Sequence, residues 1–185
     1  MKKKAVILIL AVVVAVQSVN IAADIKVHAQ PTEATKEVTF QPLPEAMNIE
    51  MQEQVFKICK EEGVSFPMVM AIIRKESEFN KDAIGEKGDS GLMQVVPQWH
   101  TERMKELGIT DIMEPLQNIR VGVNYLAECL RNHPGNAADA LMAYNMGEKR
   151  ASELIKQGVC ESEYAADIEE IMNGYNEWMV NYEEE

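Results

Sequence analysis

The chain has 185 residues, of which 46% are hydrophobic, and a net charge of −12 at pH 7. This length suits one folded domain with short appendages, and the composition is sufficient for a buried core. The acidic balance argues against binding to nucleic acid and against electrostatic docking on anionic lipid, because both need clustered Lys and Arg. A solvated, acidic surface that keeps the protein soluble is the simplest explanation of the charge.

The N-terminus is typical of an export signal. Three lysines at positions 2–4 precede an apolar run from Ala5 to Val16, and cleavage candidates follow at Ala23 and Ala29. The run is shorter than the roughly 20 residues that span a bilayer. We therefore predict a signal peptide at residues 1–29, with an uncleaved N-terminal membrane anchor as the alternative. Either way the rest of the chain is exported, to an extracellular or cell-wall location.

Three further segments follow the signal. Residues 30–46 hold three prolines among polar residues, which predicts a flexible linker without a core of its own. Residues 47–182 are expected to form the folded domain. Residues 183–185 are three glutamates, which predict a solvated acidic tail.

The domain is predicted to be mainly α, a compact set of helices with one irregular segment. Helices are expected from about Ile49 to Glu62, from after Ser65 to about Ser77, and then at Pro97 to Gly108, Leu116 to Asn132, Ala137 to Met146, Glu148 to Gln157 and Ser162 to Tyr182. Ser65 is a good N-cap, and Pro67 lies just inside that helix. Three glycines between Phe79 and Val96 predict a small loop or hairpin there.

The cysteines and histidines indicate no metal site and no cofactor. Cys59, Cys129 and Cys160 match no metal-binding spacing, and the three histidines are scattered along the chain. Outside the cell two of the cysteines can pair and leave one thiol over. Cys59 and Cys129 also lie in helical patterns, where a free cysteine is more often a small buried apolar group.

One carboxyl group continues a buried helical stripe. Val69, Ile72, Ile73 and Glu76 are spaced i, i+3, i+4, i+7, so they share one helix face. Burial disfavours the charged form of a carboxyl and raises its pKa, which produces a general acid that keeps its proton near neutral pH. Position alone favours a solvated helix end, since most charged residues are exposed. The segments that follow decide between the two interpretations.

Three motifs follow one another along the chain, and the first of them begins at Glu76. They are ESEF at 76–79 with GDSGLMQ at 88–94, then DIMEPLQNIRVGVNYL at 111–126, then AYNMG at 143–147. In this order they resemble the soluble lytic transglycosylase family, whose members have goose-type lysozyme-like folds. The resemblance covers about Phe66 to Tyr164 and favours a catalytic role for Glu76.

The resemblance implies a reaction on peptidoglycan glycan strands. Family members cleave the β-1,4 bond between N-acetylmuramic acid and N-acetylglucosamine, and the muramic acid 6-hydroxyl closes onto C1 to give a 1,6-anhydro end. One carboxyl can serve as acid and then as base, because the nucleophile belongs to the substrate. Ordinary glycosidases need two carboxylates at a defined separation. Glu76 is the single acid that the resemblance requires.

The resemblance also implies substrate-binding residues, which are Ser90, Met93, Gln94, Tyr144, Asn145 and Tyr164. Gln94 is expected to offer a donor and an acceptor to the sugar, and Met93 a polarizable apolar surface. The Tyr144 hydroxyl is expected to orient the Glu76 carboxyl, and Tyr164 corresponds to a tyrosine on the substrate side. Helix packing is the expected role of Asn118, Gly122 and Tyr125.

The chain departs from the family pattern at three positions. Lys81 replaces the usual Pro, Trp99 replaces a usual Thr, and Met146 stands where a small residue is common. Trp99 either adds a stacking surface at the edge of the cleft or belongs to the core. These changes bear on the substrate preference and leave the reaction class unaltered.

Two other functions compete with the transglycosylase. A hydrolytic muramidase of similar fold often has an Asp soon after the Gln, but Val95, Val96 and Pro97 occupy that stretch, so Asp89 is the nearest substitute. A non-catalytic glycan-binding scaffold is the second alternative, and a helical regulator is a distant third. Roles in wall growth, in a secretion or conjugation assembly, or in a phage-like element all fit the sequence.

Overall fold

The computed structural model describes residues 39–159 and 162–182. The predicted signal at residues 1–29, the first part of the predicted linker, Cys160 and the acidic tail lie outside the described residues. Within the described part, no helix is long and apolar enough to cross a membrane.

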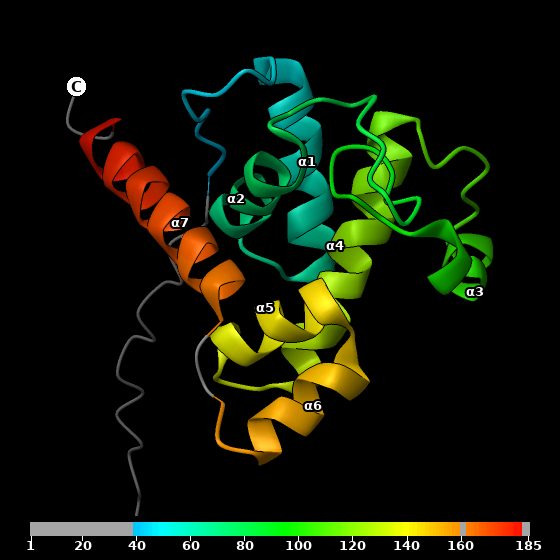
Figure 1. Ribbon diagram of the computed structural model, residues 1–185. Helices are drawn as coiled ribbons and strands as arrows, with labels where there is room; N and C mark the ends of the chain where they lie inside the picture. The colour runs from blue at the N-terminus through cyan, green and yellow to red at the C-terminus, as the bar shows by residue number, and fades with distance from the viewer. Residues whose placement is uncertain (1–38, 160–161, 183–185) are drawn as a thin grey trace, which may run out of the picture. The chain divides into compact units, whose positions relative to one another are not determined.

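Helices dominate the described part of the chain (Figure 1). They are α1 (Ile49–Glu62), α2 (Phe66–Ser77), the 3-10 helix η1 (Pro97–Trp99), α3 (Thr101–Glu106), α4 (Pro115–Asn132), α5 (Ala137–Met146), α6 (Glu148–Lys156) and α7 (Glu163–Tyr182). The segment between α2 and η1 is a loop with two isolated antiparallel β-bridges, from Ser90 to Ile84 and to Val95. The prediction of a mainly α fold with a small Gly-rich loop is therefore confirmed.

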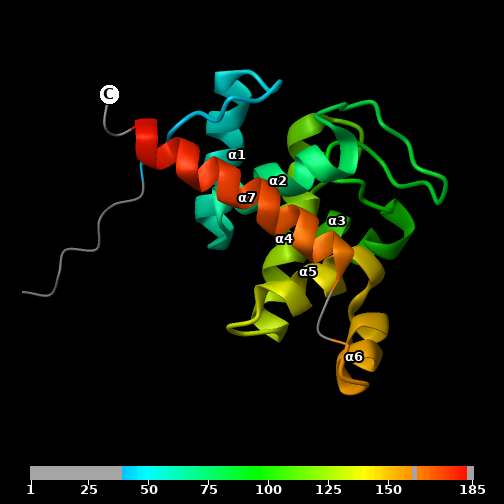
Figure 2. The same cartoon turned by 60° about the vertical axis from the view of Figure 1, so that its left-hand side comes forward.

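Helix α2 is the buried centre of the domain. It begins after Ser65 with Pro67 in its first turn, and its residues from Met68 to Ile73 are all buried. It packs against α1 and most extensively against α7, which crosses it and also contacts α5 (Figure 2). A helix that is apolar on every side belongs in a core. The end of α2 therefore lies where the core meets the surface.

The predicted helix from Pro97 to Gly108 is two helices. His100 leaves the helical conformation at φ −121°, which separates η1 from α3. Its ring packs against Tyr125 of α4, with the two ring centroids 4.7 Å apart. A tertiary contact thus interrupts a run that local propensity would continue.

The linker prediction is wrong for residues 39–46. The Phe40 ring lies 5.6 Å from that of Phe56 and 5.9 Å from that of Phe66, measured between ring centroids. Leu43 is buried, and its backbone N–H and C=O bond the side-chain amide of buried Gln52 at 2.8 and 3.0 Å. Burial of these apolar side chains is favourable, and it outweighs the tendency of the local prolines to leave the segment unpacked. The packed domain therefore begins before Met47.

The thiols of the two described cysteines are buried. Cys59 and Cys129 are free, and burial raises the pKa of Cys59 to about 12 and that of Cys129 to about 11. Both act as small apolar groups in the core, as their helical pattern predicts.

Asn118 of α4 fixes the loop between α2 and η1. It is fully buried; its Oδ1 accepts from the Met93 N–H at 2.8 Å, and its Nδ2 donates to the carbonyls of Ser90 at 2.7 Å and Ile112 at 3.1 Å. A Cβ on Gly91, which has φ +69°, would lie 2.6 Å from the Asn118 Nδ2. Glycine therefore serves both the turn and the close approach. Asn118 is buried as the expected packing role requires, but its side chain binds the loop and the turn before α4 and not another helix.

Gly122 of α4 provides a test of how tightly this loop is packed. A Cβ at Gly122 would lie 2.6 Å from the Met93 sulfur and 2.8 Å from its Cβ. Gly122→Ala should therefore lower the free energy of unfolding by about 1–3 kcal/mol, through overpacking that exceeds the gain in helix propensity. Thermal unfolding followed by circular dichroism measures the loss.

Gly174→Ala is the matched control. Gly174 lies in the exposed part of α7, and nothing lies within 4 Å of a Cβ built there. This variant should unfold at the same temperature as the parent or higher, since alanine is the better helix former by about 1 kcal/mol. Equal melting temperatures for the two variants would contradict the packing argument.

Candidate active site

A cleft of about 570 Å³ opens beside the end of α2. Its lining includes four residues that the sequence predicts for the site, namely Glu76, Gln94, Tyr144 and Asn145. The other lining residues are Lys87, Asp89, Val95, Val96, Trp99, His100, Arg103, Tyr125, Glu128 and Gly147. The volume is within the range of about 300–1,000 Å³ that is usual for ligand pockets.

The Glu76 carboxyl is half-buried at the rim of the core. Burial raises its pKa above the ordinary value of 4.5, while a hydrogen bond from the Tyr164 hydroxyl at 2.6 Å lowers it. The negative charge of Asp89 raises this pKa further, and the positive charge of Lys75 lowers it. The net shift is upward, which is the direction that the buried stripe predicts.

The hydroxyl that contacts Glu76 belongs to Tyr164, which corrects the prediction for Tyr144. Tyr164 is in the first turn of α7, and α7 packs along α2. The Tyr144 hydroxyl donates instead to the Met93 carbonyl at 3.0 Å. Tyr144 therefore lines the cleft and supports the loop, while Tyr164 orients the carboxyl.

Two predicted substrate contacts face the interior. Met93 is 1% exposed, and its side chain lies against Gly122, so it offers no surface to a sugar ring. Ser90 is 8% exposed, and its hydroxyl donates to the Gly88 carbonyl at 2.9 Å. Both predictions are wrong for the same reason, since the close packing of the loop on α4 turns these side chains inward.

Gln94 lies in the cleft wall in a strained conformation. Its φ of 46° is in the left-handed region, which costs a non-glycine residue about 1–2 kcal/mol. Its side-chain amide donates to the carbonyls of Gly91 at 2.9 Å and Ala83 at 3.3 Å. These bonds close the loop on itself and hold the strained residue in place. Gln94 therefore supports the loop as well as lining the cleft.

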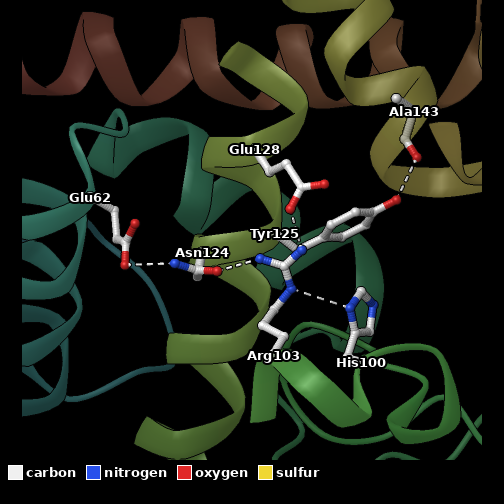
Figure 3. Close-up of polar contacts among 7 residues, drawn as sticks. All are labelled: Glu62, His100, Arg103, Asn124, Tyr125, Glu128 and Ala143. Atoms are coloured by element: carbon white, nitrogen blue, oxygen red, sulfur yellow. Dashed lines mark hydrogen bonds and ion pairs between the residues drawn. The ribbon is translucent and has the colours of Figure 1, made fainter. Parts of the chain in front are cut away.

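An arginine that sequence analysis missed organises another part of the cleft lining (Figure 3). The Arg103 guanidinium lies 5.2 Å from the Tyr125 ring centroid, donates to Glu128 at 2.5 Å and donates to the His100 Nδ1 at 3.4 Å. It also donates to Asn124. Arg103 and Glu128 are 25 residues apart, so no local pattern reveals the contact. We call these five residues the Arg103 network.

The Arg103 network joins four helices. Asn124 donates onward to Glu62 of α1 at 3.0 Å, and the Tyr125 hydroxyl donates to the Ala143 carbonyl of α5 at 3.1 Å (Figure 3). Burial, followed by the charge of Arg103, lowers the pKa of His100 to about 4. The imidazole is therefore neutral at physiological pH and can accept a hydrogen bond at Nδ1.

Metal ligands do not gather in the described part of the chain. Within residues 39–159 and 162–182, no group of three His, Cys, Asp or Glu side chains is placed to hold a metal ion.

The domain that carries the cleft matches a known family. Residues 53–166, more than half of the chain, match the family described as "Transglycosylase SLT domain". The chain belongs to this family, which confirms the resemblance drawn from the three motifs.

The matching relatives are longer proteins. The chain is 32% identical over 114 residues to the soluble lytic murein transglycosylase of Salmonella typhimurium, which covers 58% of this chain and 18% of that protein. It is 35% identical over 98 residues to a membrane-bound lytic murein transglycosylase F of Desulfosudis oleivorans, and this match covers 49% of this chain and 20% of that protein. The chain therefore spans about a fifth of these relatives.

A solved structure agrees with the sequence match. An inactive mutant of the lytic transglycosylase Slt from Pseudomonas aeruginosa superposes with a TM-score of 0.62 at 25% identity, covering 70% of this chain and 24% of that one. The similarity supports the lysozyme-like fold class that the motifs predict.

Tyr164→Phe tests the hydrogen bond to Glu76. The bond favours the carboxylate, so its removal should raise the pKa of Glu76 further. Carbon-13 NMR of the labelled carboxyl measures this pKa directly. Tyr144→Phe is the control, because that hydroxyl donates to Met93 and should leave the Glu76 titration in place. A larger shift for Tyr144→Phe than for Tyr164→Phe would contradict the assignment.

Glu76→Gln tests the burial of the carboxyl through stability. The pKa of Glu76 is higher in the folded state than in the unfolded chain. Its contribution to stability is therefore fully present at pH values below the unfolded pKa, and it is lost as the pH rises through the folded pKa. Gln keeps the shape without the charge. The variant should match the parent near pH 4 and be more stable than the parent near pH 7, as measured by urea unfolding.

Glu177→Gln controls for the loss of one negative charge, because Glu177 is exposed on α7. If Glu76→Gln differed from the parent in stability by the same amount at pH 4 and at pH 7, the pKa of the Glu76 carboxyl would not be raised by burial.

Proposed function

We propose that this chain is a peptidoglycan lytic transglycosylase. It cleaves the β-1,4 bond between N-acetylmuramic acid and N-acetylglucosamine and leaves a 1,6-anhydro end. The observation that carries the proposal is the half-buried carboxyl of Glu76, whose pKa is raised and which lines a cleft in a domain of the SLT family. The relatives, which include soluble and membrane-bound lytic murein transglycosylases, support it.

The proposed reaction uses Glu76 twice. In its protonated form Glu76 donates the proton to the glycosidic oxygen, and the bond from that oxygen to C1 of the muramic acid breaks. The resulting carboxylate takes the proton of the muramic acid 6-hydroxyl, whose oxygen forms the new bond to C1. This returns Glu76 to its protonated form without a second carboxyl or a water.

The neighbours of Glu76 suit both halves of this cycle. Burial and the Asp89 charge keep the proton on Glu76 at the start. The Tyr164 hydroxyl donates to the carboxylate once the proton has left, which stabilises the intermediate state. Cleft residues Gln94 and Asn145 are proposed to contact the sugars.

A hydrolytic muramidase is the second candidate, and Asp89 is the observation that favours it. Asp89 lines the same cleft as Glu76 and its charge acts on the Glu76 carboxyl, so it is a carboxylate that could activate a water. Transglycosylation remains the stronger proposal because it follows the family and needs one acid. A glycan-binding scaffold without catalysis is less supported, since it gives no reason for a raised pKa in the cleft.

The proposed setting is outside the cytoplasmic membrane. Residues 1–29 are proposed to export the chain as a cleaved signal or to tether it as an anchor, and residues 47–182 to carry the catalytic domain. Participation in a larger secretion or conjugation assembly is a further part of the proposal, since a small catalytic domain would open the wall locally.

Digestion of purified sacculi tests the reaction. The parent should release muropeptides with 1,6-anhydro ends, which mass spectrometry distinguishes because hydrolytic products are heavier by one water. Glu76→Gln should lower the rate by a factor on the order of 10² to 10⁴ or more, since it removes the general acid.

Asp89→Asn separates the two candidates. If the chain is a transglycosylase, the variant should still form the anhydro product. The pH at which activity falls on the alkaline side should be lower, because the charge that raises the Glu76 pKa is removed. Products heavier by one water, together with loss of their release in Asp89→Asn, would favour the muramidase.

A further inference from the structure

Trp99 is an exposed aromatic residue at the edge of the cleft. It ends η1 and is 68% exposed, although tryptophan is buried in most of its positions in proteins. This decides between the two interpretations that the sequence left open, since Trp99 is not part of the core. Its indole also lines the cleft that contains Glu76.

A second cavity adjoins the cleft and shares part of its lining. This cavity has a volume of about 420 Å³ and shares Trp99, His100, Arg103 and Glu128 with the cleft. Its further lining is polar, with Gln98, Thr101, Glu102 and Glu106. Glu76 lines the first cavity, and Trp99 lines both. Two adjoining cavities suit a chain of several linked units.

The backbone that carries Trp99 is rigid. Pro97 fixes one end of η1, and the Trp99 N–H donates to the Val96 carbonyl at 3.0 Å. The residue that follows, His100, packs on Tyr125 and accepts from Arg103 in the Arg103 network (Figure 3). A surface that is already ordered loses little conformational entropy when a ligand binds.

We propose that Trp99 is a platform on which one sugar ring of the glycan strand stacks, at a subsite beyond the bond that Glu76 cleaves. The C–H groups on one side of a pyranose ring carry partial positive charge, and the face of an indole ring is negative. Gln98 and Glu128 beside the platform offer amide and carboxylate groups to sugar hydroxyls. The platform rests on the proposed function, because it assumes a glycan substrate in this cleft.

The second tryptophan provides a natural control. Trp178 is 43% exposed on α7, and its indole N–H donates to the Pro42 carbonyl at 3.2 Å. Its role is therefore to hold the segment before α1 against α7. The chain contains two tryptophans, so each can be observed alone after replacement of the other.

Fluorescence tests the platform without catalysis. In the Glu76→Gln, Trp178→Phe protein only Trp99 emits in the tryptophan range. The β-1,4-linked hexamer of N-acetylglucosamine should shift this emission to shorter wavelength in a saturable way. In the Glu76→Gln, Trp99→Phe protein, where Trp178 alone emits, the hexamer should leave the emission unchanged.

Calorimetry gives the contribution of the ring to affinity. On the Glu76→Gln background, Trp99→Ala should weaken hexamer binding by roughly 10-fold and Trp99→Phe by less, because phenylalanine retains part of the stacking face. Trp178→Phe should bind as the parent does. Melting temperatures of the variants verify that the fold is intact.

Three results would overturn the platform: no binding of the hexamer, binding that leaves the Trp99 emission unchanged, or equal affinity in Trp99→Ala. The proposed reaction fails separately. If sacculi yield only products heavier by one water while the hexamer shifts the Trp99 emission, the transglycosylase proposal falls and the platform stands.

Discussion

The buried side-chain amide of Asn118 is the interaction on which the site depends. The loop between α2 and η1 has only isolated β-bridges in its described course, so its shape is not set by a sheet or a helix. Asn118 uses the oxygen and both hydrogens of its amide on this loop and on the turn before α4. Each polar group left without a partner at such depth would cost about 1–3 kcal/mol. The amide therefore selects one loop conformation, in which Gln94 lines the cleft.

Opposing influences set the acidity of Glu76, and the proposed cycle requires both. A pKa that is too low leaves no proton for the leaving oxygen, and one that is too high leaves no base for the 6-hydroxyl. Burial and Asp89 act in one direction, while Tyr164 and Lys75 act in the other. Because Tyr164 comes from α7, the last helix of the described chain is part of the proposed catalytic arrangement.

Local signals in the sequence predict the helices and the acid, but not the partners of the acid. Ser65 and Pro67 mark the start of α2, and Gly63 ends α1, because capping depends on neighbouring residues. Which tyrosine reaches Glu76 depends instead on packing between α2 and α7, across 88 residues of sequence. Tyr144 lies in a recognisable motif, and the motif alone therefore predicted the wrong hydroxyl as the partner of Glu76.

The outer wall of the cleft is held by tertiary contacts rather than by helix propensity. Helix α3 has six residues and η1 has three, and helices this short are not stable on their own. Arg103 binds them to α4 through a ring face, a carboxylate and an amide at once, which uses the planar fork of donors that lysine lacks. The position of Trp99 therefore depends on the Arg103 guanidinium, which lines the cleft but forms its contacts with other side chains of the protein. The shape of the proposed glycan subsite is thus set by residues that need not touch the glycan.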